Sequence, residues 1–153
     1  ISEAKIPSNI KIISSYAFYE IKNLQKVTFE KNSKLKIIDE SAFFSSNIDD
    51  FFIPTNVYKI SDYAFSYCEN LRKVNFDENS KLEIIGEFAF AYSNIGDIFI
   101  PANVSKIPEN AFSDCQELKI IEISEESKLL DSLSDLYLDL CKNTIIMVPQ
   151  KIK

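Results

Sequence analysis

The chain has no histidine, only two glycines and only three cysteines among its 153 residues. Histidine is the commonest general base and a frequent zinc ligand, so its absence excludes Ser-His-Asp and Cys-His catalytic arrangements. Two glycines cannot form a glycine-rich phosphate loop, and three scattered cysteines do not make a zinc site. The adjacent carboxylates Asp49 and Asp50 could take part in acid–base chemistry, but they lie on a repeating surface with no pocket implied, which favours a solvated role. We therefore expect a protein that is not an enzyme and that binds no metal ion and no cofactor.

Basic runs and long apolar runs are missing as well. The formal net charge is −6, and without a basic stretch neither nucleic acid nor an anionic membrane is an expected partner. No stretch approaches the roughly 18 apolar residues that a membrane-spanning helix needs, so we expect no direct membrane insertion by this segment. No signal peptide is present, but the chain begins at Ile1 rather than at methionine, so that absence does not bear on the compartment.

What the chain does contain is a repeat. The sequence Ile-Pro-Thr-Asn-Val at 53–57 has counterparts at 6–10 and 100–104, so a unit of about 47 residues recurs. The pair Ala-Phe recurs at half this interval, which gives a true coil of about 23–24 residues. The Ala-Phe pairs stand at 17–18, 42–43, 64–65, 89–90 and 111–112. The unit holds two coils because a longer connection, as at 30–34, alternates with a shorter one, as at 54–56, while the apolar positions keep their register.

Each coil closes with an apolar triplet, such as Leu71, Val74 and Phe76. This Leu-x-x-Leu-x-Leu spacing, with a period of about 23–24 residues, predicts a repeat solenoid of the leucine-rich-repeat, α/β type. Stacking the coils predicts a short parallel ladder, with strands about 4.8 Å apart, on the concave face. The Ala-Phe arm would form the crossover on the convex face, where residues such as Ser14 and Asp39 predict a short α- or 3₁₀-helical turn.

The repeated Phe is expected to fill the core, so that Phe18, Phe65 and Phe112 form a single internal column. Cys68 and Cys115 occupy equivalent positions two coils apart, and a separation of about 10 Å is too long for a disulfide. We expect both to be free thiols that fill a slot in the core.

The pattern Ile-Pro-x-x-Val-x-x-Ile-x-x-x-Ala-Phe-x-x-Cys-x-x-Leu-x-x-Val-x-Phe, complete at 53–76, resembles the BspA-like subclass of leucine-rich repeats. The resemblance is clear over 6–123 and looser over 128–152. Departures are Ile21, which stands at the cysteine position of the first copy, and Gly86, the only glycine at the position that follows the second isoleucine. The resemblance implies surface-exposed adhesion and interaction proteins of oral anaerobic bacteria, and large families in parasitic protists such as trichomonads and Entamoeba.

Residues 1–153 are expected to form one array of about six coils with partial ends. We expect a piece of a longer array, because 4–7 looks like the end of an earlier strand and 148–152 repeats the opening of a coil. The segment 128–145 is a degenerate repeat, predicted to be more helical than the other arms, and a candidate partial cap. In it Leu136-Tyr137 replaces Ala-Phe, and the environment of its Cys141 is left open.

Outward-facing strand positions are the candidate partner-binding site, because solenoids bind through the concave face. These positions are Thr28, Phe52, Asn75, Phe99, Glu122 and Met147. The apolar ones fall on every second rung, about 10 Å apart, and either anchor a partner or simply pack against neighbouring rungs. Beside them runs a charge ladder of Lys26, Asp50, Lys73 and Asp97. Register-fixing ion pairs are the favoured role of this ladder over ligand recognition, although the same residues could do both.

The sequence supports two hypotheses about function, which belong to different classes of protein. The first is a non-catalytic protein-binding module, secreted or at the cell surface, that presents its concave face for adhesion to host protein, matrix or another cell. The second is an intracellular scaffold that docks inside a larger assembly in the cytoplasm. Both take a protein partner, and the residues leave the oligomeric state and the ligand open. On the convex arm, Tyr16, Tyr63 and Phe88 are expected to be half-buried packing groups.

Overall fold

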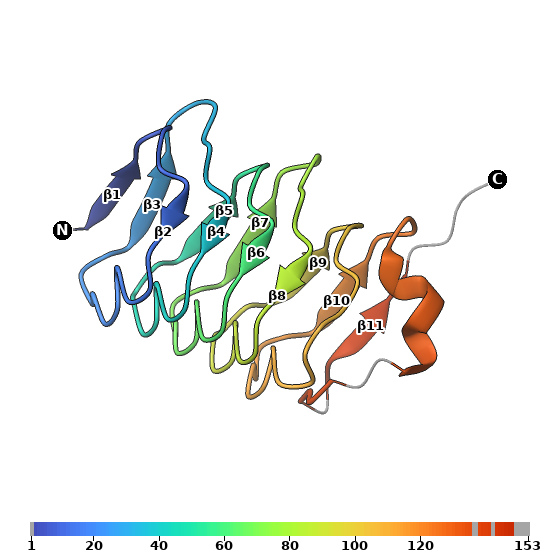
Figure 1. The fold of residues 1–153 in the computed structure, drawn as a ribbon. Coiled ribbons are helices and arrows are strands. Elements are labelled where there is room, and N and C mark those ends of the chain that lie inside the picture. Colours follow the sequence, from blue (N-terminus) through green and yellow to red (C-terminus); the bar gives the residue numbers. More distant parts are fainter. Residues whose placement is uncertain (1, 136–137, 142, 149–153) are drawn as a thin grey trace.

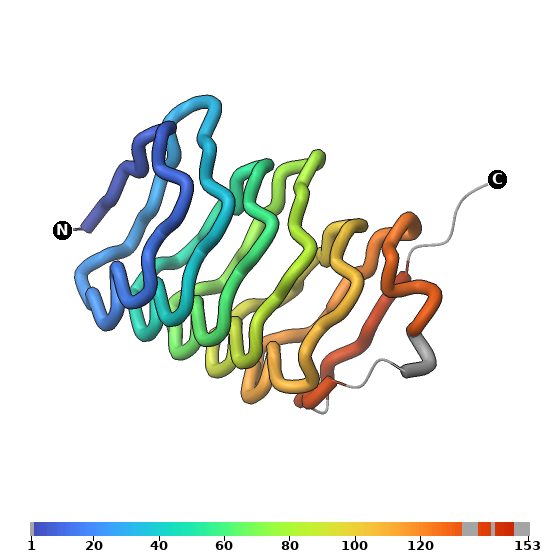
Figure 2. Tube along the Cα trace, in the orientation of Figure 1, coloured from blue at the N-terminus to red at the C-terminus, as the bar shows by residue number. Residues whose placement is uncertain are grey.

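The computed structural model describes residues 2–135, 138–141 and 143–148 and shows a parallel β-solenoid (Figure 1). Each coil rises through one strand, turns through a loop, descends on the opposite side and returns through a zigzag arm (Figure 2). The rising strands, here the primary ladder, are β1 (Glu3–Ile6), β3 (Lys26–Phe29), β5 (Asp50–Ile53), β7 (Lys73–Phe76), β9 (Asp97–Ile100), β10 (Ile120–Ile123) and β11 (Ile145–Met147). The predicted repeat solenoid is confirmed.

Strand β5 shows why the rising segments are strands. Phe51 and Ile53 are buried while Asp50 and Phe52 are exposed, the alternation that a strand with one covered face requires. Paired strands are in exact coil register, with Phe51 opposite Val74 in the neighbouring coil. One face of each strand therefore packs against the core, and the other face is open to solvent.

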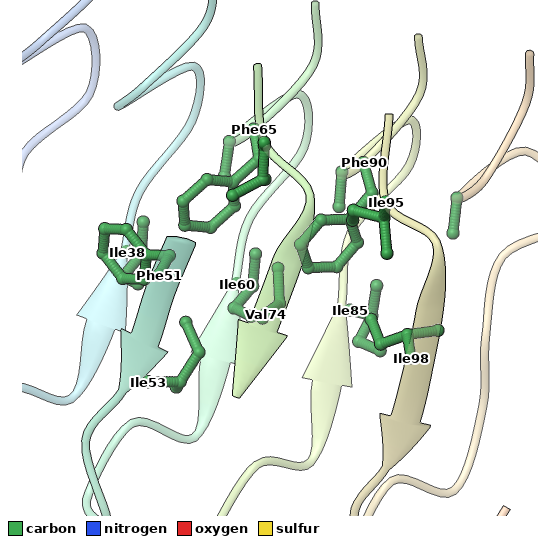
Figure 3. Close-up of a cluster of buried hydrophobic side chains, with 14 of the residues drawn as sticks. Ile38, Phe51, Ile53, Ile60, Phe65, Val74, Ile85, Phe90, Ile95 and Ile98 are labelled. Atoms are coloured by element: carbon green, nitrogen blue, oxygen red, sulfur yellow. The ribbon is translucent and has the colours of Figure 1, made fainter. Parts of the chain in front are cut away.

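The repeated Phe rings form the predicted internal column. Phe43 stacks on Phe65 with ring centroids 5.3 Å apart, and Phe65 stacks on Phe90 at 5.5 Å. The column extends to Phe18 at one end and Phe112 at the other, with every successive pair within 9° of parallel. Figure 3 shows Phe65 and Phe90 side by side among the isoleucines of the core. The small alanines before four of the rings are fully buried and let the arms approach the core, whereas Ala17, before Phe18 in the first coil, is exposed.

Cys68 and Cys115 are buried free thiols, as predicted. Each Sγ donates to a carbonyl one coil away, Cys68 to Phe43 at 3.1 Å and Cys115 to Phe90 at 3.0 Å. Burial raises the pKa of both thiols to about 11, so they stay protonated at neutral pH. Cys141 is a free thiol that is partly buried.

The arms at 14–22, 39–47, 61–70, 86–94 and 108–117 are successions of turns, which corrects the expectation of short helices. In the first four arms every second amide of the turn donates to the neighbouring coil, as Phe43 does to the Ala64 carbonyl and Ser45 to the Ser66 carbonyl. These amides are therefore not free for the i→i−4 bonds of an α-helix. Positive φ angles, such as 56° at Ser45, reverse the chain between them. The arms thus add a backbone ladder of their own.

Helical structure occurs in the degenerate repeat. The 3₁₀ segment η1 (Lys128–Asp135) follows β10, in the part of the chain that was predicted to be more helical than the other arms. Leu136 and Tyr137, the pair that replaces Ala-Phe, lie outside the described residues.

A second ladder that the sequence pattern did not indicate covers the side opposite the primary ladder (Figure 1). Its two-residue strands are β2 (Ile12–Ile13), β4 (Ile37–Ile38), β6 (Lys59–Ile60) and β8 (Ile84–Ile85). They pair in parallel without interruption, and the second residue of each points into the core. Strands of two residues are too short to show a period in the sequence.

The primary ladder is interrupted, which corrects the expectation of one continuous ladder. Pairing joins β1 to β3, β5 to β7, and β10 to both β9 and β11, but over the described residues none joins β3 to β5 or β7 to β9. Each interruption follows a strand with the longer loop (Figure 2). Just before the strands the coils remain bonded, with the Asp49 amide 3.2 Å from the Gln25 carbonyl and the Gly96 amide 3.1 Å from the Arg72 carbonyl. The strands therefore start together and diverge toward the loops.

Candidate binding surface

The predicted apolar row lies on the outward face of the primary ladder. Phe52, Phe99 and Met147 are 45%, 44% and 39% exposed. Polar residues stand opposite them in register, Asn75 beside Phe52 and Glu122 between Phe99 and Met147. The fourth polar position, Thr28, is half-buried on β3. The interruption between β7 and β9 places Phe52 and Phe99 in separate sheets, so the predicted even spacing holds only from Phe99 to Met147.

The predicted charge ladder is assembled only in part. Asp50 and Lys73 are direct register partners on β5 and β7, and both are exposed. Lys26 is instead opposite Glu3, and Asp97 is opposite Ile120. The interruptions fall between Lys26 and Asp50 and between Lys73 and Asp97. Of the expected pairs of opposite charge on neighbouring coils, Asp50 and Lys73 therefore lie directly opposite each other, where they can help to fix the strand register.

A groove of about 1090 Å³ opens where β3 and β5 diverge. The sequence had implied no pocket, because it did not show that strands with unequal loops would separate. The loops 30–34 and 54–56 form part of the wall. Predicted site residues that line the groove are Lys26, Thr28, Asp50, Phe52 and Asn75. The alternation of loop lengths was the signal that could have located it.

The lining offers the groups that recognise a polypeptide. Lys31 and Lys34 supply cations, Glu30 and Asp77 supply carboxylates, and Asn56 supplies an amide that can both donate and accept. Exposed Phe52 adds an apolar surface beside them. Such a mixture of an aromatic anchor and polar groups is typical of protein interfaces. Over the described residues, no group of three metal-ligating side chains occurs, and no helix is long and apolar enough to cross a bilayer.

A second set of exposed rings lies on the arms, where the sequence predicted half-buried packing groups. Tyr16 and Tyr63 are exposed, which corrects that expectation, whereas Phe88 is half-buried and stacks on Tyr63 at 5.1 Å. Rings on successive arms stack on one another, as Tyr67 does on Tyr92 at 4.3 Å. Some of these aromatic residues precede the repeated Phe of their arm and others follow it. The sequence spacing therefore did not reveal that the rings lie in a row.

Stacked coils, a parallel ladder at the Leu-x-x-Leu-x-Leu positions and an internal Phe column define a leucine-rich-repeat solenoid. The family model described as BspA type leucine rich repeat region matches residues 1–119 and 83–153 in six copies. The chain belongs to this family.

Solved structures carry the same fold. The pneumococcal vaccine antigen PcpA is 33% identical over 82% of the chain, with a TM-score of 0.77. A leucine rich cell surface protein from Faecalibacterium prausnitzii is 30% identical over 84% of the chain, with a TM-score of 0.58. A leucine-rich repeat protein from Bacteroides capillosus is 28% identical over 80% of the chain and 77% of its own length, with a TM-score of 0.56. The chain spans only 31% of the pneumococcal structure and 40% of the Faecalibacterium one, and no curated protein matches it.

Proposed function

We propose that this chain is a protein-binding module of a surface-exposed adhesion protein, and that it presents the outward face of the primary ladder to host protein, matrix or another cell. The observation that carries this proposal is the pairing of exposed Phe52 with the groove between β3 and β5. Exposed aromatic side chains at the centre of a polar surface are typical interface anchors. Membership of the BspA-type family and likeness to a vaccine antigen and a cell surface protein support a surface location.

The binding residues divide into two groups. Phe52, Phe99 and Met147 would contribute apolar contact area, while Lys26, Asp50, Lys73 and Asp97 would set orientation and association rate. Thr28, Asn75 and Glu122 would supply hydrogen bonds between the apolar anchors. The segment 128–145 would act as a partial cap, because η1 replaces the second-ladder strand of its coil.

Binding is tested with the purified chain on surfaces coated separately with fibronectin, laminin, fibrinogen and collagen, and on fixed epithelial cells. The test variant is Phe52→Ala/Phe99→Ala, and the matched control is Ile84→Ala, an equally exposed apolar residue on the second ladder. We expect saturable binding to at least one surface that the double variant weakens about tenfold and the control leaves unchanged. Equal binding by the wild type, the double variant and the control would show that the binding site does not lie on the outward face. No saturable binding to any of these surfaces would contradict the adhesion function.

The compartment has its own test. Antibodies raised against the chain should label intact cells that produce the full-length protein, without permeabilisation. Labelling that appears only after permeabilisation would support the intracellular scaffold instead.

A further inference from the structure

The arms lie at the end of the coils away from the long loops (Figures 1 and 2). A row of neighbouring aromatic rings, some stacked and some tilted, runs along four successive arms. Tyr16 is 5.4 Å from Tyr19, Tyr19 is 4.9 Å from Phe44, Phe44 is 5.4 Å from Tyr67, and Tyr67 is 4.3 Å from Tyr92. We call these five residues the arm aromatic row. Its four tyrosines are exposed, Tyr16 the most at 54%, and Phe44 is half-buried. The row is separate from the buried Phe column and from the primary ladder.

Backbone geometry holds several of these rings outside the core. Tyr16, Tyr67 and Tyr92 have φ angles of 62°, 59° and 61°, a left-handed conformation that is unfavourable for a non-glycine residue. Ser45 takes the same conformation at the position equivalent to Tyr67 and Tyr92. The turn itself therefore accepts a small polar side chain there. The tyrosine rings add exposed area and stacking that the turn does not need.

The surface around the row is almost entirely acidic. The arm segments carry nine carboxylates and one cation, Lys22, for a formal charge of −8. The rest of the chain has 14 carboxylates and 16 cations, for +2, which together give the overall −6. The carboxylates of the arms are Glu20, Asp39, Glu40, Asp62, Glu69, Glu87, Glu109, Asp114 and Glu117. Negative charge is thus concentrated on the edge of the solenoid that bears the rings.

One carboxylate of the arms interacts with a tyrosine of the row. The Asp114 carboxylate accepts from the Tyr92 hydroxyl and raises the pKa of Tyr92. Tyr67 stacks on the other side of Tyr92, one coil further from this carboxylate. An aromatic face next to a carboxylate is the arrangement that recognises a guanidinium group, which stacks on the ring and donates to the oxygens.

We propose that the arm aromatic row and its flanking carboxylates form a second docking surface, which binds an extended, arginine-rich segment of a partner protein. The charge of −8 on the arms favours a cationic partner and excludes nucleic acid by repulsion. Exposed rings on successive coils give cationic side chains repeated sites along the solenoid axis, because a ring attracts a cation within about 6 Å of its centroid. This surface is independent of the proposed adhesion site, which lies on the primary ladder.

The test measures fluorescence anisotropy with a labelled 12-residue peptide of alternating Arg and Ser. A matched peptide carries citrulline, a neutral analogue of the same shape, in place of Arg. The variant Tyr67→Ser/Tyr92→Ser removes two rings and installs the residue that occupies the equivalent position in the coil of Ser45, so folding should be preserved. Phe52→Ala/Phe99→Ala is the control on the primary ladder. A separate variant, Glu87→Gln/Asp114→Asn, removes two charges and keeps the rings.

We expect the Arg peptide to bind the wild-type chain about tenfold more tightly than the citrulline peptide. The Tyr67→Ser/Tyr92→Ser variant should weaken binding about fivefold with a melting temperature close to that of the wild type, and the charge variant should weaken it as well. The primary-ladder control should bind like the wild type, which separates failure of this surface from failure of the adhesion site. Binding that depends on salt but not on the tyrosines would show diffuse charge attraction and overturn the proposal. Equal affinity for both peptides, as a neutral glycan-type site would give, would also overturn it.

Discussion

Phe65 and Phe90 lie one coil apart with ring centroids 5.5 Å apart and ring planes within 5° of parallel. Both rings are fully buried, and each is preceded by a fully buried alanine. The same residue type in the same place in five successive coils turns the core into a stack in which each inner ring contacts the one above and the one below. Stability is therefore shared between nearest neighbours along the axis.

Removing one ring from this stack should leave a void that the neighbouring coils cannot fill. We expect Phe65→Ala to lower the free energy of unfolding by about 3–5 kcal/mol in urea denaturation. Phe99→Ala, at an exposed position, should cost less than about 1 kcal/mol. Amide exchange should accelerate most in the coils on either side of Phe65. A uniform acceleration along the chain would contradict nearest-neighbour coupling.

The two glycines offer a matched pair of substitutions. A Cβ on Gly86 would lie 2.4 Å from the Asp62 amide nitrogen, whereas a Cβ on Gly96 meets no atom within 4 Å. Gly86→Ala should therefore cost about 1–3 kcal/mol through overpacking against backbone. Gly96→Ala should change stability by less than about 0.5 kcal/mol. Thermal unfolding of both variants checks the contrast, and equal melting temperatures would show that the coils can separate to admit the methyl group.

The buried thiols should make the fold sensitive to alkali. Burial raises the pKa of Cys68 and Cys115 from 9.0 to about 11, so the folded state holds these protons more tightly than the unfolded state. Their contribution is present below pH 9 and is lost as the pH rises toward 11, by roughly 2–3 kcal/mol per thiol at most. The urea midpoint should fall between pH 8 and pH 10.5. Cys68→Ser/Cys115→Ser should reduce that fall, because it removes the two thiols that titrate. The fold should accept serine there, since the equivalent positions of alternate coils already hold it, as at Ser46 and Ser93.

Asparagine side chains join neighbouring coils at the end of the arms. The Asn94 side-chain amide donates to the Glu69 carbonyl at 2.6 Å, and Asn47 makes the equivalent bond to Lys22 at 2.5 Å. Asn94→Ala should cost about 0.5–1.5 kcal/mol through loss of that bond. Asn94→Asp keeps the shape but replaces the donor by an acceptor that faces a carbonyl, so we expect a larger loss from it than from alanine in the same denaturation experiment.

Much of this architecture could be predicted from the sequence, because a fixed period assigns each position to a side. The period placed Phe65 in a column, Cys68 in the core and Phe52 on the outward face. It could not show how Ser41 and Ser45 reverse the chain with positive φ, because that conformation is stabilised by amides that donate to the neighbouring coil. Strands of two residues, such as β6, left no periodic trace.

The binding surfaces were less predictable than the core. Outward residues such as Phe52 and Asn75 were assigned correctly to one face, but their grouping depends on where the primary ladder opens. Unequal loops cause that opening, and a pattern of apolar residues does not report loop geometry. Tyr67 and Tyr92 stack across coils because of turn conformation, whereas sequence spacing places Tyr19 and Tyr67 at different offsets from their Phe.

The interruptions of the primary ladder also have a mechanical consequence. Fewer backbone bonds cross from β3 to β5 and from β7 to β9 than within the paired strands, so these joints are the weakest planes under tension along the axis. The two interruptions lie about 47 residues apart, so a block of two coils that came away at these joints and unfolded would release roughly 150 Å of extended chain. We expect such a protein to lengthen under load in discrete steps. Each step would dissipate work before the paired strands within a block separate.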